Sequence, residues 1–139
     1  MKIGTGMAVA ATLATLGAWT AATAGAAPSA EGAPFSKEQA EAGRQLYETQ
    51  CVECHAADLS GAKGTPLRGE AFQSKWHGQT IRSLYAKIRA TMPPEDPGSL
   101  SESETLAITA YLLSHQEKGL SGEPATSAAD LGERRLVLR

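Results

Sequence analysis

Two cysteines, Cys51 and Cys54, stand three residues apart in the chain, and His55 follows the second one directly. A disulfide between them would close only a very short loop and add little stability. The pattern Cys-x-x-Cys-His is instead typical of covalent attachment of a c-type haem. Both thiols can reach the two haem vinyl groups from one turn of chain, which brings the histidine beneath the iron. We therefore predict one haem c, bound through Cys51 and Cys54 and coordinated by Nε2 of His55.

Other uses of this pattern fit the sequence less well. A zinc site needs four ligands, and beyond residue 26 only His77 and His115 could add to the three above. A thioredoxin-like redox motif requires strands around it, and nothing in the chain has the pattern of a strand of any length. The net charge of −2 gives no concentrated basic patch, which argues against binding of nucleic acid.

The first residues have the pattern of an export signal. Met1-Lys2 gives a positive start, an Ala-rich apolar run follows to about Trp19, and Ala24-Gly25-Ala26 offers a small-x-small cleavage site. We predict a signal peptide over residues 1–26, with Ala22-Thr23-Ala24 as a second cleavage site. A retained anchor is the alternative, but the run contains little Leu. We expect a periplasmic protein with no stable membrane span after cleavage.

The rest of the chain predicts an all-α domain at residues 36–117, between a flexible lead-in at 27–35 and a flexible tail at 118–139. Three or four short helices with long loops are expected, beginning after Ser36, near Glu70, after Thr80 and after Ser101. Gln39 and Glu104 would complete capping boxes with the serines three residues before them. Such a chain has a weak protein-only core for its size, so a large apolar cofactor at its centre would stabilise it.

Gly43 interrupts the first predicted helix, on the same face as Ala40, Leu46 and Tyr47. Glycine at such a position costs about 1 kcal/mol relative to alanine. It therefore suggests the close approach of another backbone, although chance would also explain it.

Met92 is the only methionine beyond residue 26, and it precedes Pro93 and Pro94. We predict that it is the sixth ligand of the iron, with His77 and His115 as the alternatives. His/Met ligation raises the reduction potential and fills both axial positions, which favours electron transfer over catalysis. A haem enzyme or gas sensor would need an open or labile sixth position.

The second ring nitrogen of His55 needs a hydrogen-bond partner. The carbonyl group of Pro66 could accept from Nδ1, or Pro66 could simply rigidify its loop. The sequence by itself favours neither reading.

Five segments together resemble class I cytochromes c, in the order found in that family. They are Gly43-x-x-x-Tyr47, Cys51–His55, Thr65-Pro66-Leu67, Thr91-Met92-Pro93-Pro94 and Ala110-Tyr111-Leu112. The resemblance implies a small cytochrome c fold with its helices wrapped around one haem, and no enzyme activity. It also implies that His55 and Met92 are the axial ligands and that the Pro66 carbonyl accepts from His55. The remaining haem contacts that it implies are Leu67, Phe72, Trp76, Leu84 and Ile88.

A narrower resemblance concerns the segments 67–72, 91–94 and 97–101 together with Trp76. They are similar to cytochrome domains that are fused to, or partner, periplasmic quinoprotein (PQQ-dependent) dehydrogenases. This resemblance implies a dehydrogenase as electron donor and an oxidase or another cytochrome as acceptor.

Two functions from this class remain open. The first is a free single-electron carrier in a periplasmic respiratory or dehydrogenase chain. The second is a dedicated cytochrome subunit of a PQQ-dependent dehydrogenase, with residues 118–139 as its docking segment. Basic side chains between the haem motif and Met92 would steer acidic partners or simply form a solvated surface: Lys63, Arg68, Lys75, Arg82, Lys87 and Arg89.

Overall fold

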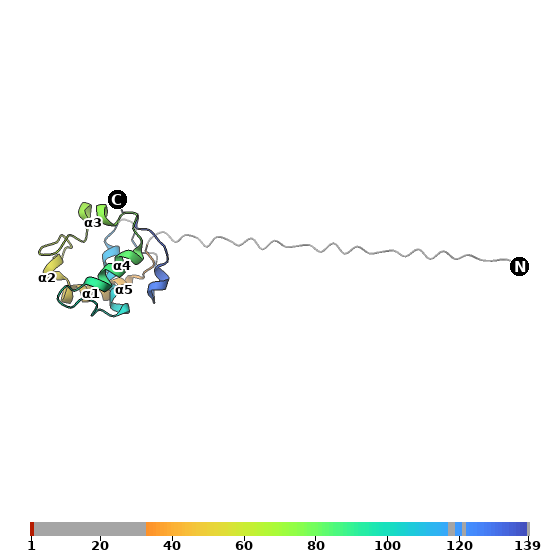
Figure 1. Cartoon of the computed structure of the whole chain (residues 1–139), viewed down its shortest axis with the longest axis horizontal. Coiled ribbons are helices and arrows are strands. Elements are labelled where there is room, and N and C mark those ends of the chain that lie inside the picture. Colours follow the sequence, from red (N-terminus) through yellow and green to blue (C-terminus); the bar gives the residue numbers. More distant parts are fainter. Residues whose placement is uncertain (2–32, 117–118, 121, 139) are drawn as a thin grey trace.

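The computed structural model describes residue 1 and residues 33–116, 119–120 and 122–138. It contains α1 (Lys37–Gln50), α2 (Val52–His55), α3 (Gly69–Trp76), α4 (Ile81–Thr91), α5 (Glu102–Ser114) and the short 3-10 helix η1 (Ala128–Leu131) (Figure 1). The described residues form no strand, only two isolated bridges, so the predicted all-α class is confirmed. The extra helix, α2, is a single turn made by the Cys-x-x-Cys-His segment itself. Apart from Met1, the expected signal peptide lies outside the described residues.

The first and last long helices, α1 and α5, pack directly against each other. A Cβ atom added to Gly43 would lie 1.9 Å from the carbonyl oxygen of Ala107. The Tyr47 and Tyr111 rings also pack against each other across this contact, tilted by 51° with centroids 5.1 Å apart. The close backbone approach predicted from Gly43 is confirmed.

Side-chain caps begin three of the helices. Ser36 accepts from the Gln39 amide, Thr80 accepts from the Ser83 amide, and Ser101 forms a reciprocal capping box with Glu104. The capping box predicted for Gln39 is wrong. The Gln39 side chain instead brackets the backbone of Ala125, donating to its carbonyl at 2.7 Å and accepting from its amide at 3.1 Å.

Described residues of the expected flexible lead-in and flexible tail pack against the helical domain. Phe35 is fully buried, and the Ala33 amide donates to the Gly119 carbonyl. In the tail the buried residues are Ala125, Leu131, Leu136 and Leu138. Residues 118–139 are mostly small and polar, so their few apolar side chains gave no clear sign of packing in the sequence. In the structure these apolar side chains belong to the hydrophobic core.

The end of the tail lies beside the loop that follows α3, where Figure 1 places the C-terminal end. A short antiparallel bridge joins Arg135 to Thr80 there. Among the described residues, no helix is long and apolar enough to cross a bilayer.

Candidate haem-binding site

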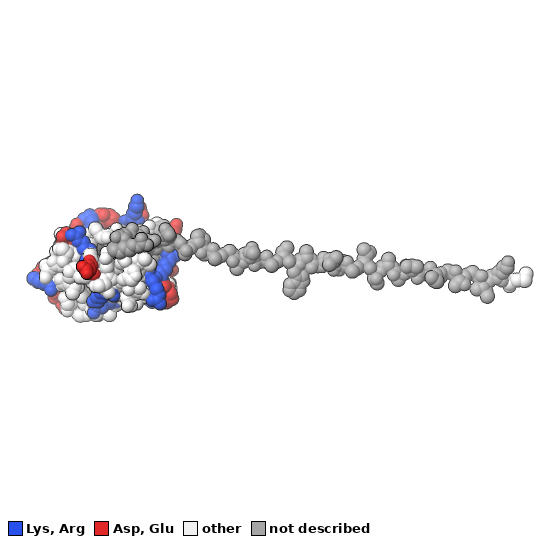
Figure 2. All heavy atoms as spheres, turned by 90° about the horizontal axis from the view of Figure 1, so that it is seen from above, with Lys and Arg blue, Asp and Glu red and all other residues white. Residues whose placement is uncertain are grey.

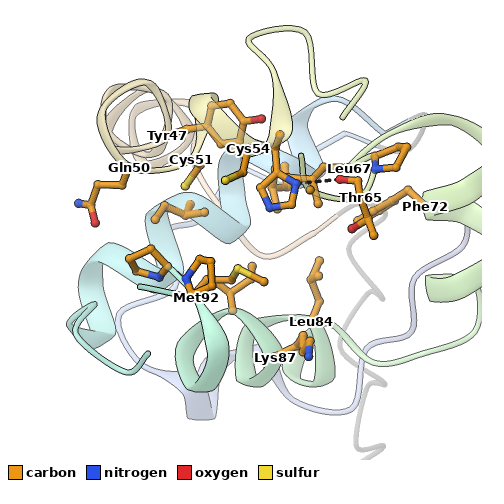
Figure 3. Close-up of a pocket in the computed structure, with 18 of the residues that line it drawn as sticks. Tyr47, Gln50, Cys51, Cys54, Thr65, Leu67, Phe72, Leu84, Lys87 and Met92 are labelled. Atoms are coloured by element: carbon orange, nitrogen blue, oxygen red, sulfur yellow. Dashed lines mark hydrogen bonds between the residues drawn. The ribbon is translucent and has the colours of Figure 1, made fainter. Parts of the chain in front are cut away.

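A cavity of about 490 Å³ opens between the Cys-x-x-Cys-His turn on one side and α3, α4 and α5 on the other (Figure 3). Its volume is within the range of about 300–1,000 Å³ that is usual for cofactor sites. The structure brings every site residue predicted from the sequence to its wall: Cys51, Cys54, His55, Pro66, Leu67, Phe72, Trp76, Leu84, Ile88 and Met92. These residues come from three helices (α2, α3 and α4), from the positions that flank them and from one loop, so only the tertiary fold unites them.

A backbone carbonyl group orients the His55 imidazole. Nδ1 of His55 lies 2.7 Å from the carbonyl oxygen of Thr65, shown by the dashed line in Figure 3. When Nδ1 donates this hydrogen bond, the lone pair of Nε2 is free to bind a metal. The acceptor predicted from the sequence, the Pro66 carbonyl, is therefore wrong by one residue. Pro66 still lines the cavity, and its ring restricts the backbone of Thr65, the residue before it.

The loop after α2 wraps closely around the His55 ring. The Ala62 and Gly64 amides both donate to the Cys54 carbonyl, at 3.0 and 2.8 Å. A Cβ atom added to Gly64 would lie 2.8 Å from Cε1 of His55 and 2.9 Å from Nδ1. Gly64 therefore makes room for the ring. The sequence predicted no role for Gly64, and Thr65 entered only as part of the segment Thr65-Pro66-Leu67. The available signal for both was the glycine-rich loop that follows the histidine ligand.

The cysteine thiols point into the cavity from the α1–α2 side (Figure 3). Burial first, and then the neighbouring Cys54, raises the pKa of the Cys51 thiol to about 11. Cys51 is thus a neutral thiol near pH 7. Thiol–disulfide exchange needs a thiolate, so this environment does not favour it. The described residues also contain no cluster of three or more His, Cys, Asp and Glu side chains suited to a metal ion.

Met92 enters the cavity from the wall opposite the Cys-x-x-Cys-His turn (Figure 3). It ends α4, where its amide donates to the Ile88 carbonyl at 2.9 Å, and the Met92–Pro93 peptide bond is cis. The two alternative ligands lie elsewhere. His77 contacts the Leu138 carbonyl, and His115 packs edge-on against Tyr111. Neither histidine lines the cavity.

The Tyr47 hydroxyl anchors the chain just after the haem motif. It donates to the Ala56 carbonyl at 2.7 Å, and Ala56 has a left-handed φ of 61°. Such a conformation is uncommon for a residue other than glycine. The bond therefore helps to hold the reversal that turns the loop back over His55.

Three lysines, Lys63, Lys75 and Lys87, line the edge of the cavity. Lys63 is paired with Glu53. The Lys75 ammonium lies 5.6 Å from the centre of the Trp76 ring. Elsewhere on the molecule charges of both signs are interspersed, as on the face in Figure 2. Of the six basic residues noted in the sequence, Arg68 and Arg82 also have acidic partners, Asp58 and Glu133.

The donor set fits a covalently attached haem. Two thiols and an imidazole share one wall, a thioether faces them, and mainly apolar side chains lie between. With these residues in place, Cys51 and Cys54 would hold the haem and His55 and Met92 would ligate its iron.

Comparison with known proteins is consistent with this arrangement. A family model described as cytochrome C oxidase, cbb3-type, subunit III matches residues 38–112. Cytochrome c-551 of Bacillus subtilis is 33% identical over 55% of this chain and 66% of its own length. Thiosulfate dehydrogenase of Stutzerimonas stutzeri is 33% identical over 53% of this chain but only 26% of its own length. The cbb3-type oxidase subunit CcoP of Rubrivivax gelatinosus is 29% identical over 69% of this chain and 31% of its own length.

Among solved structures, the sulfane dehydrogenase SoxCD of Paracoccus pantotrophus matches 78% of this chain and 61% of its own, with a TM-score of 0.55 and 19% identity. That similarity concerns the fold. The chain spans about a quarter to two thirds of the length of the named relatives that it matches.

Proposed function

The chain belongs to the family described as cytochrome C oxidase, cbb3-type, subunit III, and from this membership of the class I c-type cytochromes we propose that it is a single-electron carrier. It binds one haem c, covalently through Cys51 and Cys54, with His55 and Met92 as axial ligands. It is exported and works in the periplasm, where it exchanges electrons with other redox proteins. It is a carrier and not an enzyme.

The observation that carries this proposal is the position of Met92 on the wall opposite the Cys-x-x-Cys-His turn. Nε2 of His55 is left free by the Thr65 hydrogen bond on one side, and a thioether is available on the other. A metal held by both groups has no open axial position for dioxygen or peroxide. This supports outer-sphere electron transfer.

The bound haem supplies the iron couple that takes up and releases one electron. The protein contributes the ligands and a mainly apolar environment. Phe72, Leu84 and Ile88 are each buried and line the cavity, so they exclude water from it. A thioether ligand and a water-poor setting both raise the reduction potential of a haem.

Partners follow from the same chemistry. We propose a periplasmic dehydrogenase as donor and an oxidase or another cytochrome as acceptor. The named relatives support redox partners of this general kind, because they include an oxidase subunit and a dehydrogenase. They also favour the second candidate, a dedicated cytochrome subunit of a dehydrogenase complex. A PQQ-dependent dehydrogenase as that partner stays a prediction.

The test is an optical redox titration of the exported, haem-loaded protein, with mass spectrometry to count haems. We expect one covalent haem, a single one-electron transition, the weak near-infrared sulfur-to-iron band in the oxidised form, and little binding of carbon monoxide to the reduced form. A missing band together with rapid carbon monoxide binding would contradict Met92 ligation and the carrier function. Co-purification of a dehydrogenase in fixed ratio would favour the subunit role.

A further inference from the structure

Residues 133–138, which we call the C-terminal strap, contact the loop just before α4 through several hydrogen bonds. The Gly78 amide donates to the Leu136 carbonyl and the Leu136 amide donates to the Gln79 carbonyl, both at 2.8 Å. The Arg135 side chain donates to the Gly78 carbonyl at 2.7 Å. This contact is a short antiparallel pairing and not a loose tail.

The strap also completes the start of α4. The first amides of a helix have no partner within the helix. In α4, Thr80 Oγ1 accepts from the Ser83 amide, and the Arg134 carbonyl accepts from the Ile81 amide at 2.9 Å. A segment more than fifty residues further along the chain thus provides half of this cap.

His77 fixes the end of the strap. Its Nδ1 atom lies 2.7 Å from the Leu138 carbonyl oxygen, so the imidazole donates to the strap from the residue directly after α3. Leu136 and Leu138 are buried beside it. His77 lies away from the cavity, so its role is not to bind haem.

At its other end α4 stops at Thr91 and Met92 follows as the capping residue, while Leu84 and Ile88 on the same helix line the cavity. Because a helix moves as one body, a displacement of the α4 start would also move the Met92 thioether. We propose that the C-terminal strap, held by His77, is a positioning element that keeps Met92 in place as the sixth ligand. This inference rests on the proposed ligation of the iron by Met92.

The test compares holoproteins: wild type, a chain ending at Glu133, His77→Ala and His77→Asn. The truncated chain is expected to lose part of the sulfur-to-iron band and to bind carbon monoxide faster when reduced. His77→Ala should accelerate carbon monoxide binding by about two- to tenfold. Loss of one net hydrogen bond changes an equilibrium constant by about this factor, here the equilibrium between bound and displaced Met92. His77→Asn should reverse most of this change, because the Asn amide can donate from nearly the same position as Nδ1.

The control is Gln39→Ala. This substitution removes the two hydrogen bonds between the Gln39 side chain and the Ala125 backbone. It loosens the C-terminal region from α1 but leaves the hydrogen bonds of the strap to the start of α4 in place. Amide hydrogen exchange across α4 gives a readout independent of the haem. Faster exchange in α4 and faster carbon monoxide binding are expected for His77→Ala and the truncation but not for Gln39→Ala.

The outcomes separate the two proposals. If the wild-type protein lacks the sulfur-to-iron band, the proposed ligation is wrong. If the wild type has the band while the truncated chain and His77→Ala keep it at full strength with unchanged carbon monoxide binding, ligation stands and the positioning role of the strap is wrong. Equal effects from Gln39→Ala would also overturn it, since they would reflect general loosening.

Discussion

The Nδ1 atom of His55 and the carbonyl oxygen of Thr65 lie 2.7 Å apart although the two residues are ten positions apart in the chain. The intervening loop is closed by two hydrogen bonds to the Cys54 carbonyl. The loop therefore determines the orientation of the His55 ring. Substitutions within the loop should change the midpoint potential of the haem.

Gly64→Ala tests that dependence. The added methyl group would lie within 3 Å of the His55 ring, so either the ring or the loop must shift. We expect a loss of about 1–3 kcal/mol in the free energy of unfolding, measured by chemical denaturation, and a changed haem midpoint potential. Ala62→Ser adds one atom at an exposed position of the same loop and should change neither. Equal behaviour of the two variants would mean that the loop does not constrain the ring.

Replacing Met92 by Ala removes the proposed sixth ligand. We expect the midpoint potential to fall, the sulfur-to-iron band to disappear and the reduced protein to bind carbon monoxide. An unchanged potential in a redox titration would contradict ligation by Met92. Met92 ends a helix beside other apolar residues, so circular dichroism should confirm that the variant stays folded.

Gly43→Ala should destabilise the protein although alanine is the better helix former. The new methyl group would meet the Ala107 carbonyl oxygen at 1.9 Å. Overpacking of this kind costs about 1–3 kcal/mol, more than the roughly 1 kcal/mol gained in helix propensity. Because the obstructing atom belongs to the backbone, adding Ala107→Gly should not restore stability. Higher thermal stability of Gly43→Ala would contradict the close approach.

Tyr47→Phe removes the hydroxyl that donates to Ala56. The Ala56 carbonyl then keeps only the longer hydrogen bond from the Leu59 amide, at 3.2 Å. We expect the free energy of unfolding to fall by about 0.5–1.5 kcal/mol, the net contribution of one hydrogen bond, which urea denaturation will measure. Tyr85→Phe is the matched control, because the hydroxyl of this buried tyrosine makes no hydrogen bond to the described residues. The control should stay within about 0.5 kcal/mol of wild type. Similar losses in both variants would indicate a packing effect alone.

The same tyrosine contact predicts a dependence on alkaline pH. Burial raises the pKa of Tyr47 and also that of Tyr111. The folded protein thus retains protons that the unfolded chain loses above about pH 10. The stability from these groups is complete below that pH and is lost as the pH rises through the folded pKa values. Urea denaturation from pH 8 to 11 should show this decline, and the double variant Tyr47→Phe/Tyr111→Phe should show a shallower one.

The sequence allowed much of the fold to be predicted. Ser36, Thr80 and Ser101 marked helix starts correctly because capping is local chemistry. Gly43 indicated a close contact because a glycine within a helix lowers helix stability, and a close backbone approach explains why it is there. All ten predicted site residues came together at one cavity, since the haem motif and its order of surrounding segments constrain the topology strongly.

The errors concern contacts that span most of the chain. Gln39 pairs with Ala125, 86 residues away, and no local pattern distinguishes that partner from a capping box. His77 meets Leu138 in the same way. The shift from Pro66 to Thr65 arose because two adjacent carbonyl groups are equivalent in sequence and differ only in the direction that the loop gives them.

The long reach of the strap has a consequence for the order of assembly. Its contacts join residues 57 and 61 positions apart, and the entropy of closing such long loops delays them relative to local helix formation. During synthesis residues 133–138 also emerge after every residue of the cavity wall. Cys51 and Cys54 are therefore available for haem attachment before the strap has formed its hydrogen bonds with residues 77–81. We expect the cavity wall that carries Met92 to be the last part of the pocket to reach its final position.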